Sequence, residues 1–358
     1  MNSGLEGIVA AETALSHVDG EAGELVIRGW RIEELAGRRS FEGMLSLLWT
    51  GLAPGWNDEA DPRRVLGRAR ERAFAIAEPL FPALPDLAPV ERLRLLLSAL
   101  GDGEETPHPL LAVAAMPVFI AGLERLRQGA APVAPDPRLS QAADFLRMLR
   151  GASASAAHVQ ALDTYLVTVA DHGLNASTFA ARIIASTRAG LFSAVIGALC
   201  ALKGPLHGGA PGPVLDMLDA IGTAENIEPW LTGALAEKRR LMGFGHRVYR
   251  TRDPRADILK RVVIGLRGEG NRIRFAEAVE AVALRLLAAR RQGRSLDTNV
   301  EFYTALLLEA LGLPRAVFTS VFAMGRVAGW TAHILEQERE GRLIRPLSAY
   351  TGPAAGAA

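Results

Sequence analysis

The stretch GFGHRVYRTRDPRAD, residues 243–257, places a histidine directly after a glycine and follows it with four arginines. Its first acid is Asp253, which stands immediately before a proline. A solvated helix face would intersperse acids with these bases, whereas here positive charge gathers beside one titratable ring. The stretch therefore predicts a local binding site for an anion.

Three of the seven histidines stand beside a glycine: His172 in ADHGLNAST, His207 in KGPLHGGAP and His246 in GFGHRVY. A single histidine is most often a satisfied surface or core residue. Glycine, however, lets a ligand approach the backbone closely, and loops on a rigid scaffold are where functional residues concentrate. The recurrence predicts that these three histidines face a ligand.

Three arginines could bind the anion. Asp253 and Pro254 predict the start of a helix, on which Arg255 either lies in solvent or faces a ligand. Arg326, in FAMGRVAGW, stands in a long apolar segment with no acid within one helical turn, and a buried arginine needs a partner. Arg345, in RLIRPLSAY, precedes a proline. Because guanidinium groups match carboxylates bidentately, the predicted partner is a small di- or tricarboxylate.

Glu301, in LDTNVEFYTALLLEALGLP, has two interpretations. Thr298 and Glu301 have the spacing of a capping box at the start of an amphipathic helix that ends at Gly312. A carboxylate at a helix N-terminus that projects into a cleft could instead act as a general base. The residues alone favour the capping role and leave open whether Glu301 acts as a general base.

Size and charge exclude several classes of protein. A length of 358 residues predicts two domains, at ~150 residues each. A formal net charge of +1, from 40 basic and 39 acidic residues, argues against a nucleic-acid or membrane-surface protein. Cys200 is the only cysteine, so no internal disulfide can form, and the first residues lack the pattern of a signal peptide. We expect a cytoplasmic protein.

Metal, nucleotide and membrane sites are not predicted. The sequence has no HExxH, no CxxC and no closely spaced histidine pair on one helical face, so no metal is expected. It also lacks the GxxxxGK[ST] motif of a phosphate-binding loop. The apolar run AGLFSAVIGALCAL, which ends before Lys203, is shorter than the ~20 residues that a membrane span needs. That run predicts a buried helix.

The hydrophobic spacing predicts a mainly α fold with only short N-terminal strands. The segment ELVIRGW alternates like a strand. Most longer segments repeat apolar residues every three or four positions and stop at Gly or Pro. Helices are predicted over residues 41–51, 90–101, 108–129, 177–190 and 316–341. Several of these are apolar on most faces, which predicts burial inside a large domain or against a second subunit.

With these residues in order, the chain resembles the citrate synthase family. The motifs that carry the resemblance are DHGLNASTFAAR, GPLHGGAP, GFGHRVYRTRDPRA, NVEFYTALLLEALG and GRVAGWTAHILEQ, and together they cover almost the whole chain. The resemblance implies a two-domain helical fold and a homodimer. Its large domain would comprise residues 1–208 and 306–358, and its small domain, residues 209–305, would close over the active-site cleft.

The resemblance also implies a reaction: condensation of acetyl-CoA with oxaloacetate, followed by hydrolysis of the thioester to citrate and CoA. Such an acyltransferase of the tricarboxylic acid cycle needs no metal and no cofactor besides the CoA thioester. The closest alternative is a 2-methylcitrate synthase that uses propionyl-CoA, since one methylene discriminates by only ~1–3 kcal/mol. A non-catalytic family member that binds oxaloacetate or CoA is the alternative from another class, and a purely structural helical dimer ranks last.

Residue roles follow from the resemblance by motif position. His207 is expected to stabilise the enol form of acetyl-CoA, His246 to polarise the ketone of oxaloacetate and His172 to contact that substrate. Glu301 takes the place of the carboxylate base. The oxaloacetate carboxylates would be bound by Arg255, Arg326 and, from the partner subunit, Arg345. The CoA-binding residues would be Arg250, Met242, Gly243 and Phe244.

One departure from the family pattern falls on the base. The usual NVDFYSG is NVEFYTA here, so Glu301 replaces an aspartate. The added methylene moves the carboxylate by about 1 Å, and a misplacement of ~1 Å can lower a rate ~100-fold. We therefore expect an active enzyme with reduced turnover unless the surrounding backbone compensates.

Overall fold

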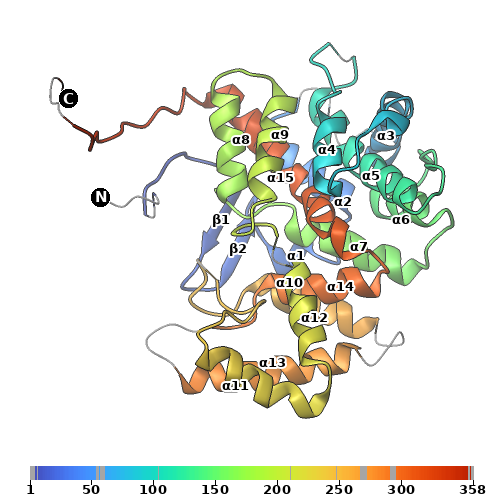
Figure 1. Ribbon diagram of the computed structural model, residues 1–358. Helices are drawn as coiled ribbons and strands as arrows, with labels where there is room; N and C mark the ends of the chain where they lie inside the picture. Colours follow the sequence, from blue (N-terminus) through green and yellow to red (C-terminus); the bar gives the residue numbers. More distant parts are fainter. Residues whose placement is uncertain are drawn as a thin grey trace.

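The computed structural model describes residues 5, 7–53, 56, 61–103, 105–209, 211–246, 248–266, 272–290, 296–353 and 355. Arg247, one of the four arginines in the 243–257 stretch, lies outside them. The described part is mainly α, as predicted (Figure 1). The strands are β1 (Ser16–Asp19), β2 (Glu24–Ile27) and β3 (Trp30–Arg31). The helices are α1 (Ile32–Leu35), α2 (Phe41–Trp49), α3 (Pro62–Ala77), α4 (Pro89–Leu97), α5 (His108–Arg127), α6 (Gln141–Arg150), α7 (Ala156–Val169), α8 (Ala176–Ser186), α9 (Leu191–Leu202), α10 (Pro211–Ile221), α11 (Ile227–Ala236), α12 (Pro254–Gly265), α13 (Arg272–Ala289), α14 (Val300–Ala310) and α15 (Phe318–Glu340).

The strands form one small antiparallel sheet in the order β1-β2-β3. Val18 pairs with Leu25, and Ile27 pairs with Trp30. Leu25 and Ile27 alternate with half-buried neighbours and are themselves fully buried. This confirms the strand predicted from the alternation in ELVIRGW, because side chains two residues apart share one face of a sheet.

Helix α15 is the centre of the fold. It contacts α2, α5, α7, α8 and α9, and nearly every side chain from Phe318 to Gln337 is buried. Its small residues, among them Gly325, Ala328 and Gly329, let neighbouring helices come close. The prediction that a segment apolar on most faces is buried is confirmed here.

Helix α5 is long and apolar enough to cross a membrane by length and composition alone. In the structure 83% of its most apolar stretch is buried inside the protein, as expected of a core helix. Helix α9, which contains the apolar run before Lys203, is likewise largely buried, as predicted.

The chain turns sharply between α9 and α10, at the glycines and prolines of GPLHGGAPGP, as predicted. Helices α10 to α14 lie together in the lower half of Figure 1, where α11 packs on α13. Helix α12 packs on both α14 and α7 and so joins this part to the rest. The domain boundaries at residues 209 and 305 remain a prediction.

Candidate active site

A cavity of about 300 Å³ lies where the loops before α8, α10, α12 and α14 meet α15. Its volume is at the lower end of the range typical of small-molecule sites. It is lined by His172, Asn175, Ala176, Pro205, Leu206, His207, Arg240, Met242, Gly243, Gly245, His246, Val248, Arg255, Asn299, Val300, Glu301, Phe322 and Arg326. Among them are most of the site residues predicted from the sequence: the three histidines, Glu301, two arginines, Met242 and Gly243.

Three helices begin at this cavity, each with a side-chain cap. Asn175 caps α8, Asp253 caps α12 and Asn299 caps α14, in each case by accepting a hydrogen bond from a backbone N–H of the first turn. The helix predicted to start at Asp253 is thereby confirmed. Helix N-termini carry partial positive charge and free N–H groups. The cavity therefore favours an anionic ligand.

The cap of α14 differs from the predicted capping box of Thr298 and Glu301. Asn299, not Thr298, caps the helix: its side chain accepts from the backbone N–H of Glu301 at 3.0 Å. The Thr298 hydroxyl instead donates to Glu280 at 2.6 Å. The capping box is therefore absent, because Thr298 has a buried acceptor from α13 that its local sequence does not show. Glu301 is free of the capping role.

His246 presents one ring nitrogen to the cavity. Its Nδ1 accepts hydrogen bonds from the backbone N–H groups of Val248, at 3.0 Å, and Tyr249, at 3.1 Å. Two donors on Nδ1 require the neutral ring to carry its proton on Nε2. His246 can therefore donate a hydrogen bond from Nε2.

His207 has the opposite tautomer. Its Nε2 accepts from the backbone N–H of Ser177 at 3.3 Å and lies 2.9 Å from the Ser177 hydroxyl. That hydroxyl also lies 2.8 Å from Asn175 Oδ1 and accepts from Trp330 Nε1 at 3.1 Å. Because Nε2 is occupied as an acceptor, the ring proton is on Nδ1. His207 can donate this proton's hydrogen bond to a ligand.

His172 is buried and held by Tyr249. Its Nε2 lies 3.1 Å from the Tyr249 hydroxyl, and the His172 and His246 rings meet edge to face with centroids 5.6 Å apart. Tyr249 also stacks on His246, with centroids 4.8 Å apart. One tyrosine thus fixes two of the three histidines, a role that the sequence analysis missed.

All three histidines are neutral near pH 7. Burial, assisted by the positive charge of Arg326, lowers the pKa of His207 to about 4. Burial and then Arg255 lower the pKa of His246 to about 4, and the same two causes lower that of His172 well below its usual range. Neutral imidazoles can polarise a carbonyl by donating a hydrogen bond without bringing a further positive charge.

Glu301 is half-buried at the second position of α14. Within the described residues its carboxylate has no hydrogen-bond partner. Burial raises the pKa of Glu301 to about 7, although the nearby Arg255 opposes this. A carboxylate with a pKa near the working pH suits a general base, because it can both take and return a proton.

The two arginines differ in how they are held. Arg255 is buried and forms a bidentate ion pair with Asp253, with N–O distances of 3.0 and 2.9 Å. The alternative that it lies in solvent is therefore wrong. Arg326 donates from Nε to the Val169 carbonyl at 2.6 Å, and its guanidinium lies 4.8 Å from the centre of the Phe322 ring. Burial lowers the pKa of Arg326 to about 10, so it stays charged at neutral pH.

The GFG segment is fixed by the strand-like residues before α14. Gly245 donates to the Asp297 carbonyl at 2.8 Å, Asn299 donates to the Gly243 carbonyl at 2.9 Å, and Phe244 forms a β-bridge with Thr298. Gly243 has φ of +85°, and a Cβ there would lie 2.8 Å from Phe302. Only glycine fits this position at the cavity wall.

Three predicted residues lie outside the cavity lining. Phe244 is buried against Phe302, with ring centroids 5.4 Å apart. Arg250 is exposed and lies 3.5 Å from Glu21 beside the β1–β2 turn. Arg345 is exposed in the extended C-terminal segment, which leads away from the body of the molecule (Figure 1).

Among the lining residues that were not predicted as site residues are Leu206, Arg240, Asn299 and Phe322. Asn299 could have been found as a cap, because Asn is a favoured residue before a helix. Phe322 stands one turn before Arg326, a spacing that brings side chains together on a helix. Leu206 and Arg240 lie in exposed loop sequence and carry no local signal.

Comparison with protein families gives one match along nearly the whole chain. The family model described as "Citrate synthase, C-terminal domain" matches residues 4–347. Among curated proteins, the chain is 37% identical to a citrate synthase from Acidithiobacillus ferridurans, over 98% of this chain and 95% of that protein. It is also 37% identical to a 2-methylcitrate synthase from Mycobacterium tuberculosis, over 98% of this chain and 91% of that protein.

Among solved structures, the chain is similar to the citrate synthase of the archaeon Thermoplasma acidophilum, in its ternary complex with carboxymethyl-coenzyme A and oxaloacetate. The TM-score is 0.87 at 27% sequence identity, over 99% of this chain and 97% of that one. The sequence similarity and the structural similarity therefore both extend over nearly the full length of the chain.

Proposed function

The chain belongs to the citrate synthase family, and we propose on that basis that it condenses acetyl-CoA with oxaloacetate and hydrolyses the resulting thioester to citrate and CoA. One observation carries the proposal: a single cavity holds three neutral histidines, two buried arginines and a carboxylate whose pKa is near 7. Only a reaction that moves a proton and binds an anionic substrate uses all of these groups.

Deprotonation of the acetyl-CoA methyl group is the first task. A thioester methyl is a very weak acid, so it needs a base together with a donor aimed at the oxygen where negative charge develops. Glu301 takes the proton, and His207 donates from Nδ1 to the thioester oxygen. Ser177 keeps Nε2 of His207 occupied, so the donor is available on the correct nitrogen.

Oxaloacetate is the electrophile. His246 donates a hydrogen bond from Nε2 to the ketone oxygen, and the enol carbon of acetyl-CoA attacks the ketone carbon. The carbonyl π bond opens, and its oxygen takes up one proton, which balances the proton that Glu301 removed. Arg255 and Arg326 bind the substrate carboxylates beside His172, where the helix N-termini favour negative charge. Water then hydrolyses the thioester, which releases citrate and the free thiol of CoA.

CoA is proposed to bind along the backbone of Met242 and Gly243. Both residues line the cavity, and Arg240 stands at the same wall with an exposed guanidinium that suits a phosphate. Arg250, which lies outside the cavity lining, is the second basic residue assigned to the CoA phosphates. No metal or further cofactor takes part in this scheme.

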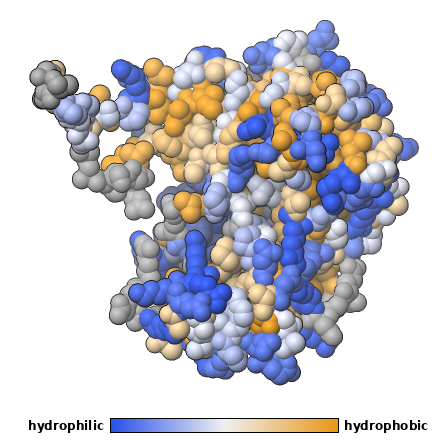
Figure 2. Space-filling model, viewed as in Figure 1, coloured by the Kyte–Doolittle hydropathy of each residue, from blue (hydrophilic) through white to orange (hydrophobic). Residues whose placement is uncertain are grey.

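Assembly into a homodimer belongs to the same proposal. Figure 2 shows apolar residues gathered over α8 and α9, where Ile183 is 36% exposed. The C-terminal segment adds Leu343 and Leu347, which are also exposed. A partner that covers this face would receive the extended segment, and Arg345 with it, at its own active site. We further propose that the protein is an acyltransferase of the tricarboxylic acid cycle, as its reaction type suggests. We also propose that it acts in the cytoplasm.

A second candidate is a 2-methylcitrate synthase that uses propionyl-CoA. The observation in its favour is the M. tuberculosis relative, which is as similar to this chain as the first citrate synthase. The two reactions share every catalytic group and differ by one methylene of the acyl chain. Such a difference is worth only ~1–3 kcal/mol in a pocket.

A thiol-release assay with oxaloacetate tests both candidates. The purified protein is given acetyl-CoA or propionyl-CoA, and the ratio of the two kcat/KM values identifies the preferred acyl group. Glu301→Gln is expected to lower kcat by at least ~100-fold, because it removes the base. The control Glu237→Gln changes an exposed glutamate and should leave kcat unchanged.

The non-catalytic alternative has a distinct outcome in the same experiment. If the parent binds oxaloacetate in a calorimeter but releases no thiol from either acyl-CoA, the protein is a binding member of the family. If Glu301→Gln is as active as the parent, Glu301 is not the base.

A further inference from the structure

The loop between α7 and α8, residues 170–175, supplies His172 and Asn175 to the cavity. Its backbone is tied at several points: Asn175 donates to the Gly173 carbonyl at 2.9 Å, and Gly173 has φ of +58°. The loop has no regular secondary structure to hold it. The position of His172 therefore depends on what holds the residues on either side of it.

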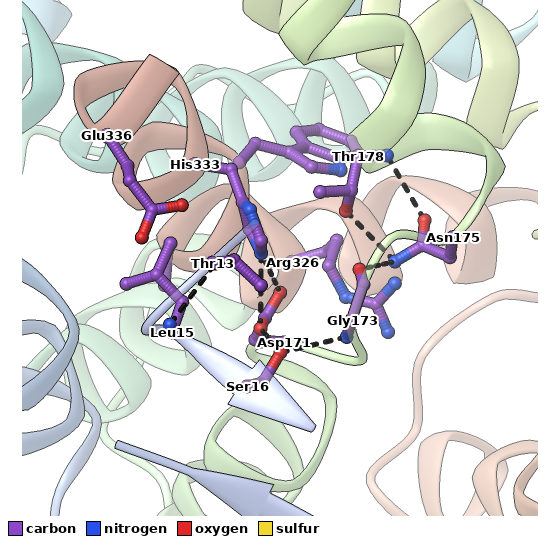
Figure 3. Close-up of polar contacts among 12 residues, drawn as sticks. Thr13, Leu15, Ser16, Asp171, Gly173, Asn175, Thr178, Arg326, His333 and Glu336 are labelled. Carbon is purple, nitrogen blue, oxygen red and sulfur yellow. Dashed lines mark hydrogen bonds and ion pairs between the residues drawn. The ribbon is translucent and has the colours of Figure 1, made fainter. Parts of the chain in front are cut away.

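Asp171, directly before His172, is fully buried and does not line the cavity, and its carboxylate faces Ser16 and His333 (Figure 3). Its Oδ2 accepts a short hydrogen bond from the Ser16 hydroxyl of β1 and another from His333 Nε2, at 3.4 Å. The same Ser16 oxygen accepts from the backbone N–H of Gly173 at 3.0 Å. His172 is thus held from both neighbours, by Asp171 before it and by Gly173 after it.

His333 lies on α15 and is fully buried. Its Nδ1 lies 2.9 Å from an Nη of Arg182, and arginine can only donate, so Nδ1 must be an acceptor. The proton is therefore on Nε2, which faces Asp171 at 3.3 Å from Oδ1. Arg182 forms an ion pair with Glu336 at 2.6 Å. This ion pair holds the guanidinium against Nδ1 of His333 and so fixes the tautomer of the ring.

The C-terminal end of α7 lies close to the middle of α15 here. Gly329 donates its backbone N–H to the Ala170 carbonyl at 3.0 Å, and Arg326 donates to the Val169 carbonyl at 2.6 Å. A Cβ at position 329 would lie 2.5 Å from the Ala170 oxygen. One face of α15 thus contacts three successive residues, through Arg326 to Val169 at the end of α7, and through Gly329 and His333 to Ala170 and Asp171 in the loop.

We propose that His333 is a positioning residue for oxaloacetate binding: through its Nε2 donor to Asp171 it sets the place of His172 in the cavity. The inference rests on the proposed function, because oxaloacetate is the ligand of His172. His333, Asp171 and Ser16 do not line the cavity, so they act through His172 and not on the substrate.

A matched pair of variants tests the inference. In His333→Gln the amide nitrogen reaches about as far as Nε2 and can still donate to Asp171. In His333→Asn the shorter amide can keep a contact to Arg182 but cannot reach Asp171. We expect His333→Asn to raise the KM for oxaloacetate by about 10-fold or more, because a displacement of ~1 Å is costly. His333→Gln should stay within about twofold of the parent.

The KM for the acyl-CoA separates positioning from a general loss of structure. We expect this KM to stay within about twofold of the parent in both variants, since the loop positions His172, which binds oxaloacetate in the proposed scheme. A purely structural role would lower the folded fraction, and so the apparent kcat, without moving either KM. Ser16→Ala removes the hydrogen bond that Asp171 accepts from β1. It is also expected to raise the oxaloacetate KM, and it can be measured even if His333→Asn fails to fold.

Two results would overturn the inference: an unchanged oxaloacetate KM in both His333→Asn and Ser16→Ala, or an equal rise in both KM values. Calorimetric titration of oxaloacetate accompanies the kinetics. A parent that binds oxaloacetate without releasing CoA overturns the proposed reaction, while the affinities of the variants still decide the role of His333.

Discussion

Ser177 contacts Nε2 of His207 with both its backbone N–H, at 3.3 Å, and its hydroxyl, at 2.9 Å. One residue therefore decides which nitrogen of the ring carries the proton. Ser177 is the second residue of α8, so the same turn that begins the helix also orients the proposed donor to the thioester.

Ser177→Ala is expected to lower kcat by about 10- to 100-fold, because the ring of His207 loses its stronger contact and turns away from the thioester. The affinity for oxaloacetate should change by less than about twofold. Steady-state kinetics and calorimetry measure the two quantities. Ser193→Ala, an exposed serine on α9, is the control. A kcat equal to that of the parent would show that the hydroxyl contact is unimportant.

The rate should rise with pH through about 7. Burial raises the pKa of Glu301 to about 7, and the base works only when deprotonated, so activity is lost as the pH falls below that value. The pKa of His207 and of His246 is about 4, so neither ring titrates in this range. A profile of kcat/KM from about pH 5.5 to 9 measures the effect. The residual activity of Glu301→Gln should lack this rising limb, and a limb that persists would point to another group.

Arg326→Gln is expected to weaken oxaloacetate binding by about 30-fold or more, since the loss of a buried charged partner costs ~2–5 kcal/mol. Arg326→Lys keeps the charge but not the bidentate geometry, and should recover only part of the affinity. Calorimetry measures the Kd values. Arg315→Gln, which removes surface ion pairs with Asp216 and Asp219, serves as the control. An unaltered Kd in Arg326→Gln would place the substrate elsewhere.

Gly329→Ala should destabilise the protein by about 1–3 kcal/mol, because the added methyl would overlap the Ala170 carbonyl. Gly233→Ala on α11 is the matched control, since a Cβ there meets nothing within 4 Å. That substitution should stabilise by about 0.5–1 kcal/mol through helix propensity. Thermal unfolding compares the two. Equal Tm values for both variants would contradict the close contact of α7 and α15.

Asp163→Asn should stabilise the protein at pH 8. Burial raises the pKa of Asp163 to about 7, so its contribution to stability is fully present below the usual aspartate pKa of about 4 and is lost as the pH rises from there through 7. Asparagine can still accept the hydrogen bond that Asp163 receives from the Phe41 N–H at 3.1 Å. We expect a gain of a few kcal/mol at pH 8, at about 1.4 kcal/mol per pKa unit, that shrinks toward pH 5. A gain that does not change with pH, measured against the exposed Asp86→Asn, would contradict this.

Local patterns were enough to predict much of the fold and of the cavity lining. Glycine beside histidine marked His172, His207 and His246, and an arginine without a nearby acid marked Arg326, because these signals lie within a few residues of each other. The cap of α14 could not be read in this way. Thr298 and Asn299 both suit a cap, and the choice depends on Glu280, an acceptor from another helix.

Pairs that are distant in the sequence were beyond prediction for the same reason. Asp171 and His333 are 162 positions apart, and nothing near either residue indicates its partner. Arg240 is an ordinary basic loop residue until the chain folds and places it at the wall of the cavity.

The late position of α15 in the chain bears on how the protein is made. Because α15 contacts α2, α5, α7, α8 and α9, a chain still growing on the ribosome lacks the helix that its earlier helices pack around. Those helices keep apolar faces uncovered until α15 has been synthesised and has left the ribosome. In that interval the exposed apolar faces make the nascent chain prone to aggregation, which is the hazard that chaperones counter.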